Sequence, residues 1–289
     1  MELPVVNNTV RASHKELNSM RTQKAFFYSI APAGPAFSDA AATASLSRFK
    51  IFLIISAMAV FFVFALFLQT ARADEKTVKI TWFGHSMFLI EFESARVLID
   101  PFSDIGYPMP LRPIICDICI VSHKHADHSN LNLAGGAYAL KDSEGFSNAG
   151  GIGVDMIKSY HDRKLGADRG INYISVFNCG NVRFAHLGDL GSYDDKLLKS
   201  LGRVDVLMIP VGGYYTIDAY DAWEIVRYLG PKIIFPMHYK TEKLDSKIPI
   251  DTAEKFISGR GNIEYFENGS CEIKLNDLPK EQMIYMFRL

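Results

Sequence analysis

Residues 121–128 read Val-Ser-His-Lys-His-Ala-Asp-His and place four metal-binding side chains close together: His123, His125, Asp127 and His128. Three imidazoles and a carboxylate at this spacing form a poor hydrophobic core, whereas they suit a divalent cation such as zinc. A histidine-rich surface turn is the alternative interpretation. The apolar run before them, residues 113–121, predicts a buried strand. The sequence therefore predicts a metal site on a loop at the end of a strand.

The spacing His-x-His-x-Asp-His after a buried strand resembles the signature of the metallo-β-lactamase fold. Further motifs of that family follow in the same order, namely Ser159-Tyr-His-Asp, Phe184-Ala-His-Leu-Gly-Asp-Leu-Gly and Ile233-Ile-Phe-Pro-Met-His-Tyr. Residues 80–90 and 97–102 resemble the family's first strands, and the resemblance covers residues 76–275. It is closest to the ascorbate-lactonase-like and N-acylphosphatidylethanolamine-phospholipase-like hydrolases. It implies a mixed α/β fold, a four-layer αββα sandwich with metal at one edge between the two sheets.

The resemblance also implies a centre of two divalent metal ions, with Zn²⁺ expected and Mn²⁺ or Fe²⁺ as alternatives. The implied ligands are His123, His125 and His161 for the first metal, Asp127, His128 and His238 for the second, and Asp189 as the bridge. Asp127 and Asp189 are the expected catalytic residues, together with a metal-bound hydroxide, because metals can lower the pKa of bound water toward ~7. His186, three residues before Asp189, is the alternative to His161 and would otherwise lie beside the ligands.

Three weaker candidates flank the motifs. His85, in the turn Phe83-Gly-His-Ser, is expected to line the pocket or to orient a ligand. Asp100 ends a strand and is expected to accept the free N–H of a ligand histidine, which is a common supporting contact in metal sites. A turn residue without a role at the site is the alternative for both. Asp162 is expected either to support a ligand or to be exposed.

Two loops are candidates for substrate contact. Glycines open the loop at residues 212–216, where Tyr215 and Thr216 are expected to contact substrate, and an ordinary glycine-rich turn is the alternative. The turn at residues 168–170 is expected to be structural. The alternative there is that Arg169 meets an anionic substrate.

The expected activity is hydrolysis of an ester-like bond in a small-molecule or lipid substrate, such as a lactone, a phosphodiester or a phospholipid. Three alternatives remain: a β-lactamase, an iron-dependent oxidoreductase on the same fold, and a non-catalytic binding protein stabilised by metal. A net charge of −1 over 289 residues gives no electrostatic reason to expect nucleic acid as a partner.

The N-terminal region is expected to lie apart from the catalytic domain, which spans residues 74–289. Residues 51–68 are uncharged and apolar, follow Arg48 and Lys50, and precede the small-residue site Ala71-Arg-Ala. This pattern predicts that residues 48–73 are a signal peptide or a transmembrane anchor, with the membrane contacted through residues 49–68 if uncleaved. Both interpretations predict an exported protein, anchored or periplasmic. Residues 1–47 are expected to be disordered or an artefact of an upstream start codon.

Hydrophobic periodicity predicts mixed secondary structure within the catalytic domain. The expected strands are residues 77–81, 87–92, 96–99, 172–177, 181–186, 204–210 and 232–236. The expected helices are residues 194–201, 219–229 and 251–258. The pair Cys116 and Cys119 is expected to be two buried core residues, with a redox pair as the alternative.

Overall fold

The structure is a computed structural model that describes residues 39–70, 76–93, 95–149 and 151–289. Contacts divide the chain into two units, residues 1–70 and 71–289. The expectations for residues 1–38 and for the cleavage site at 71–73 lie outside the described residues. In the first unit, helix α1 (Asp39–Thr70) begins before the expected boundary at residue 48. No helix in the described part of the chain is both long and apolar enough to cross a membrane.

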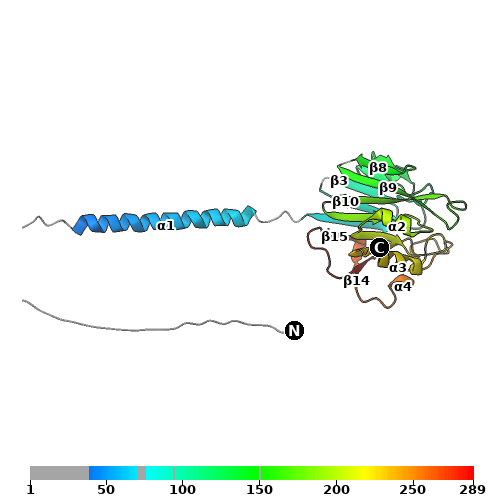
Figure 1. The fold of residues 1–289 in the computed structure, drawn as a ribbon. Coiled ribbons are helices and arrows are strands. Elements are labelled where there is room, and N and C mark those ends of the chain that lie inside the picture. The colour runs from blue at the N-terminus through cyan, green and yellow to red at the C-terminus, as the bar shows by residue number, and fades with distance from the viewer. Residues whose placement is uncertain (1–38, 71–75, 94, 150) are drawn as a thin grey trace, which may run out of the picture. The chain divides into compact units, whose positions relative to one another are not determined.

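Two β-sheets form the framework of the second unit (Figure 1). The first sheet has the strand order β15 (Ser270–Lys274), β1 (Thr77–Gly84), β2 (Met87–Phe92), β3 (Ala95–Ile99), β5 (Ile118–Ile120), β7 (Tyr138–Leu140). The second has the order β14 (Ile263–Phe266), β16 (Met283–Phe287), β13 (Ile233–Met237), β12 (Val206–Pro210), β11 (Val182–His186), β10 (Ile171–Cys179), β9 (Ile152–Tyr160), β8 (Gly145–Ala149). A separate pair consists of β4 (Ile114–Ile115) and β6 (Ala134–Gly135).

Alternation along the strands explains why the two sheets stack. On β2, the side chains of Phe88 and Ile90 belong to the core cluster that also includes side chains of the eight-stranded sheet. Those of Met87 and Leu89 belong to a second cluster on the other face. Successive side chains of a strand point to opposite faces, so β2 is buried on both sides. Phe88 meets Phe235 of β13 edge to face, with ring centroids 6.2 Å apart, which links the two sheets directly.

Helices α2 (Asp195–Leu201) and α3 (Ala219–Leu229) pack on the eight-stranded sheet, and α4 (Glu254–Ile257) packs against α3. Helix α3 begins where the Asp218 side chain accepts the amides of two first-turn residues, and it ends at Gly230 in the left-handed region. On the six-stranded sheet, the second cluster includes residues from two largely irregular segments, around residues 101–116 and 244–250. Four prolines in residues 101–113 disfavour a helix there. The mixed α/β sandwich is confirmed, and the chain that packs on this side is largely irregular.

Strand direction brings the ends of several strands to one place. In the first sheet β1, β3 and β5 run the same way, because β1 and β3 are both antiparallel to β2 and β5 is parallel to β3. In the second sheet β9, β11, β12 and β13 share one direction for the same reason. The residues that follow these strands therefore gather at one edge of each sheet, which is where α/β folds commonly build sites.

Two expectations about the elements are wrong in detail. Residues 113–121 do not form one strand, because β4 pairs with β6 while β5 joins the six-stranded sheet. Between them the carboxylate of Asp117 accepts the backbone N–H of Arg96 at 2.7 Å, which ends the first pairing. The expected helix at 251–258 shortens to α4. The other expected strands and helices are present, and Cys116 and Cys119 are buried free thiols.

Candidate metal centre

The site residues come directly after strands of both sheets. They are His85 after β1, Asp100 after β3, residues 121–128 after β5, His161 after β9, Asp189 after β11 and His238 after β13. Three of these residues have positive φ angles, which are 52° for His85, 48° for Asp100 and 51° for His238. Side chains other than glycine seldom adopt this conformation, and it clusters at functional sites.

The carboxylate of Asp189 occupies the middle of the site. Its Oδ2 atom lies 3.1 Å from His238 Nε2, 3.2 Å from His161 Nε2 and 3.7 Å from His123 Nε2. Its Oδ1 atom lies 3.2 Å from His128 Nε2. A single buried carboxylate thus faces the ring nitrogens of four histidines, as the predicted bridging role requires.

His123, His125 and His161 form one group whose possible ligand atoms lie within 4.8 Å of one another. The Nε2 atom of His123 is 3.1 Å from Nδ1 of His125. Two ring nitrogens this close either share a hydrogen or direct both lone pairs at a common cation. The group contains the three side chains expected for the first metal.

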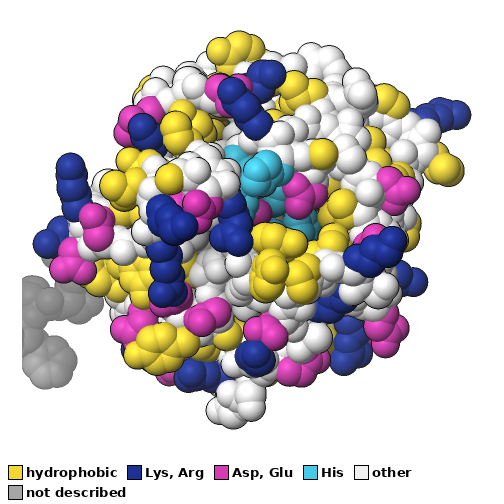
Figure 2. Space-filling view, turned by 90° about the vertical axis from the view of Figure 1, so that its right-hand side faces the viewer, with side chains coloured by type: hydrophobic (Ala, Val, Ile, Leu, Met, Phe, Trp, Pro, Cys, Tyr) yellow, Lys and Arg dark blue, Asp and Glu magenta, His cyan; other side chains and the backbone are white. Residues whose placement is uncertain are grey.

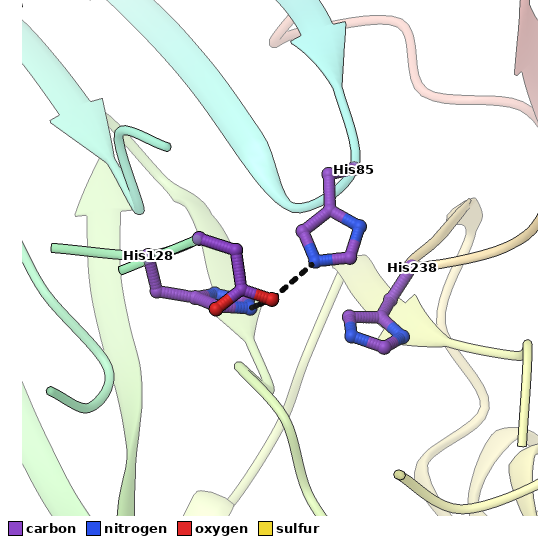
Figure 3. Close-up of side chains that lie close together, drawn as sticks. His85, His128 and His238 are labelled. Atoms are coloured by element: carbon purple, nitrogen blue, oxygen red, sulfur yellow. Dashed lines mark ion pairs between the residues drawn. The ribbon is translucent and has the colours of Figure 1, made fainter. Parts of the chain in front are cut away.

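A second group contains Asp127, His128 and His238, the set expected for the second metal, and adds His85. Figure 3 shows one carboxylate paired with the rings of His85 and His128, and the His238 ring beside that of His85. His85 Nε2 lies 3.3 Å from Asp127 Oδ2 and His128 Nε2 lies 3.8 Å from the same oxygen. The structure therefore places His85 inside the site, as one of its two interpretations predicted.

His123, His128 and Asp189 form a third group that joins the first two. The imidazoles lie at the bottom of a hollow in the surface, with acidic side chains beside them (Figure 2). His125 is exposed and the Asp127 side chain is 32% exposed, whereas His123 and His128 are buried. Solvent and substrate therefore reach the site from the side of His125 and Asp127.

The donor set fits divalent metal ions on two grounds. First, His128 Nε2, Asp189 Oδ1 and both ring nitrogens of His85 are buried and make no well-formed hydrogen bond among the described residues, although His128 Nε2 lies 3.2 Å from Asp189 Oδ1 and His85 Nε2 lies 3.3 Å from Asp127 Oδ2. Buried polar atoms are costly without a partner, and a cation between them would supply one. Second, burial lowers the pKa of His123 to about 3 and that of His85 to about 4. Both rings are therefore neutral at pH 7, the state in which histidine binds a metal.

Asp100 connects both metal groups through hydrogen bonds. Its Oδ2 atom lies 2.9 Å from His128 Nδ1 and accepts the Ser122 hydroxyl at 2.6 Å, while Oδ1 accepts the Ser122 amide. The Ser122 oxygen in turn lies 3.0 Å from His123 Nδ1. Because the hydroxyl hydrogen goes to Asp100, the hydrogen of the second contact belongs to His123 Nδ1. Nε2 of both rings then faces the other site residues, and the expected supporting contact of Asp100 is present.

His186 does not join any of the three groups. Its Nε2 atom lies 3.0 Å from the carbonyl oxygen of Ser86, and its Nδ1 atom accepts the amide of Gly188 at 3.2 Å. Both ring nitrogens are therefore occupied by the backbone. Of the two histidines left open by the sequence, His161 faces Asp189 and His186 ties β11 to the turn after β1.

Asp162 supports a loop rather than a metal ligand. Its two carboxylate oxygens accept four backbone N–H groups, those of Lys164, Gly166, Asp168 and Arg169, at 2.7–3.0 Å. Burial opposes ionisation, but these four donors outweigh it and lower the pKa of Asp162 to about 2. The carboxylate thus fixes the chain immediately after His161.

Sequence reasoning missed Asn172, which lies in β10 and is fully buried. Its amide donates to Ser159 Oγ and to the carbonyl of Leu187, and its oxygen accepts the Asp189 amide at 2.9 Å. A Cβ on Gly188 would collide with this oxygen. Asn172 therefore sets the backbone position of Asp189, and only its polarity within a strand signalled a role.

The two residues expected to contact substrate on the loop after β12, Tyr215 and Thr216, have different surroundings in the structure. Tyr215 is half-buried against the second core cluster, and the Arg169 guanidinium lies over its ring. Thr216 directs its hydroxyl to the backbone carbonyl of Ile217 at 3.0 Å, which is a structural contact. A Cβ on Gly212 would collide with the carbonyl of His238, so this loop packs tightly beside a candidate ligand.

Comparison with known proteins agrees with this geometry. The family described as the Beta-lactamase superfamily domain matches residues 79–238. A UPF0173 metal-dependent hydrolase from Archaeoglobus fulgidus is 32% identical, over 60% of this chain and 88% of that protein. A second protein of that name, from Carboxydothermus hydrogenoformans, is 31% identical over 57% of this chain and 85% of its own length.

A solved structure from Thermotoga maritima, described as a Zn-dependent hydrolase of the metallo-beta-lactamase superfamily, is 31% identical. It superimposes with a TM-score of 0.60 over 73% of this chain and 98% of its own. The metallo hydrolase Igni18 from Ignicoccus hospitalis has a TM-score of 0.54 at 22% identity, over 69% of this chain and 99% of its own, and shares the fold. The resemblance to the ascorbate-lactonase-like branch stays a prediction. The chain belongs to the beta-lactamase superfamily domain family and is a metal-dependent hydrolase of that superfamily.

Proposed function

We propose that this hydrolase is dinuclear, holds Zn²⁺, and cleaves an ester-like bond of a lactone, a phosphodiester or a phospholipid. The observation that carries the proposal is the position of Asp189, whose two oxygens face the Nε2 atoms of four histidines from both sheets. A carboxylate with two oxygens can contact two cations at once, which is the arrangement of two-metal hydrolases.

The ligand set assigned to these metals follows the three groups of side chains. His123, His125 and His161 hold the first metal, Asp127, His128 and His238 hold the second, and Asp189 serves both. His85 is a further donor toward the second metal, because its ring nitrogens are buried and its Nε2 atom lies 3.3 Å from Asp127 Oδ2, an expected ligand of that metal. Neutral imidazoles leave the positive charge of the cations largely intact, while Asp127 and Asp189 balance part of it.

When bound, the metal ions supply an activated water and a positive charge that stabilises the developing oxyanion. The chain holds the reacting groups in place through Asp100 and Asn172, which fix His128 and Asp189. Asp127 lies at the mouth of the hollow with its side chain 32% exposed. Burial raises the pKa of its carboxyl, but the neighbouring His128 and the hydrogen bond from His85 outweigh burial and lower it, so the group is ionised at pH 7 and available to hold a cation.

The first test combines metal analysis with a panel of substrates. The full-length protein is expected to bind about two equivalents of zinc and to hydrolyse a lactone or a phosphodiester, and to leave a chromogenic cephalosporin intact. His123→Ala should lower kcat/KM at least ~100-fold, because the first metal loses a ligand, and chelation should abolish activity. The matched control is Lys124→Ala, since this exposed side chain points away to Asp142 at 3.4 Å.

Three outcomes of that test contradict the proposal. Iron with a visible absorption band would favour the oxidoreductase, and rapid cephalosporin turnover would favour the β-lactamase. Protein that binds metal but hydrolyses no member of the panel would favour a binding protein.

The second test concerns Asp100. Asp100→Asn removes the negative acceptor of the His128 ring N–H, and losses of such supporting contacts lower metal affinity ~10–100-fold. Competition with a chromophoric chelator measures that affinity. Asp205→Asn is the matched control, because Asp205 is a buried carboxylate that accepts the Arg183 amide. Equal zinc affinity in the two variants would mean that Asp100 is only structural.

The third test separates His161 from His186. His161→Ala is expected to weaken one of the two zinc sites by ~100-fold or more, since it removes a direct ligand. His186→Ala is expected to keep both sites and to lower the free energy of unfolding by about 1–3 kcal/mol, because the Ser86 carbonyl loses its partner. Zinc titration and urea unfolding measure the two effects. The opposite pattern would reassign the ligand to His186.

We also propose that the chain is exported, because the uncharged apolar residues 51–68 follow Arg48 and Lys50. Cell fractionation with mass measurement of the N-terminus tests this. A periplasmic protein that begins near residue 74 is expected, as for a cleaved signal peptide. Intact protein in the cytosol would contradict export.

A further inference from the structure

The loop at residues 162–170 holds a fixed shape beside the metal groups. Asp162 accepts four of its backbone N–H groups, and the Gly170 amide donates to the carbonyl of Gly166 at 2.9 Å. The Gly170 carbonyl in turn accepts the amide of His161 at 3.1 Å. The position of this loop is therefore coupled to that of a candidate metal ligand.

Among the three cationic side chains of this loop, Arg169 differs from the other two. Arg163 pairs with Asp221 at 2.6 Å and Lys164 pairs with Asp168 at 2.8 Å. The Arg169 guanidinium has no carboxylate within ion-pair distance and no hydrogen bond among the described residues, although the side chain is half-buried. Because the Arg169 guanidinium has neither an ion-pair partner nor a hydrogen bond, its N–H donors are available to a ligand.

Tyr215 holds the Arg169 side chain from a second loop. The guanidinium carbon lies 5.4 Å from the centre of the Tyr215 ring, within the range of a cation–π contact. Such a contact can fix the guanidinium against the ring and leave N–H groups at its edge free. Arg169 and Tyr215 therefore offer an aromatic ring that positions the guanidinium, and guanidinium N–H groups that can donate hydrogen bonds to a ligand.

Both loops are tied to the segment that carries Asp189. The amide of Gly191 donates to the carbonyl of Tyr160 at 2.8 Å, next to His161. The amide of Ile217 donates to the carbonyl of Leu190, also at 2.8 Å, from the loop of Tyr215. The Arg169–Tyr215 contact thus joins the two loops that flank the bridging carboxylate. In Figure 2 both cationic and hydrophobic side chains border the hollow that contains the histidines.

We propose that Arg169 is a specificity-determining residue that binds an anionic oxygen group of the substrate, a carboxylate or a phosphate, with Tyr215 as its platform. The inference rests on the proposed function for the identity of the reacting bond, but not for the binding itself. A guanidinium offers two parallel N–H donors to such a group, which is stronger and more selective than a contact with a neutral group. The substrate class is accordingly an ester-like compound that also carries a carboxylate or phosphate group.

Binding of three small probes to the metal-loaded full-length protein tests the proposal by calorimetry. The probes are benzoate, phenylphosphonate and the neutral benzamide, which share one ring. Arg169→Met is expected to weaken at least one anion by ~10-fold or more and to leave benzamide affinity and metal content unchanged. The anion that loses more identifies carboxylate or phosphate as the natural group. Arg169→Lys keeps the positive charge but loses the paired N–H donors of the guanidinium. Its affinity for the anions should lie between those of the wild type and Arg169→Met.

The control variant is Arg163→Met, a cation of the same loop that already has a carboxylate partner. It should bind all three probes as the wild type does, which separates a specific contact from general charge and from direct binding to the metals. The proposal is overturned if wild-type protein binds neither anion, if Arg169→Met binds both normally, or if it loses benzamide and metal in parallel. Because no turnover is needed, loss of anion binding in a protein that hydrolyses nothing would refute the proposed function and keep this inference.

Discussion

The carboxylate of Asp189 is the group on which the rest of the site depends. It is buried and faces the Nε2 atoms of His123, His128, His161 and His238, two of which follow the six-stranded sheet and its loop and two the eight-stranded sheet. Burial alone would raise its pKa, but the neighbouring His128 and His238 hold the pKa well below its usual value. Cations placed between the same atoms would satisfy them more completely, so metal binding should also stabilise the contact between the two sheets.

The pairing of β3 with β5 explains how one carboxylate orients two histidines. These strands are parallel, with Ile99 opposite Ile120, and the Asp100 amide donates to the Ile120 carbonyl at 2.9 Å. This register brings Asp100 beside Ser122, whose amide and hydroxyl both donate to it. The orientation of the histidines is therefore set by hydrogen bonds of the sheet itself, and the positive φ of Asp100 is the conformational cost of that position.

The sequence predicted those parts of the site that are local. The spacing of residues 121–128 needs no tertiary information, and strand ends are recognisable from apolar runs. The prediction of a single strand at residues 113–121 was wrong because the side chain of Asp117 competes with strand continuation. Its hydrogen-bond partner Arg96 lies 21 positions away in the sequence, so the local pattern does not show it. Asn172 was missed for a related reason. Its side chain makes three hydrogen bonds, one to β9 and two to the segment that ends at Asp189. The sequence of β10 alone cannot predict these distant partners.

The choice between His161 and His186 shows where a motif needs geometry. His186 ends β11 and His161 directly follows β9, but both ring nitrogens of His186 contact the backbone of Ser86 and Gly188. His161 is followed by Asp162, whose carboxylate accepts backbone N–H groups of the next residues in the loop. That arrangement lets the loop carry surface charges such as Arg169 without moving the ligand at its base. Substitutions in this loop could therefore change the recognised group while His161 keeps its place, because Asp162 holds the loop through backbone N–H groups whatever side chains the loop carries.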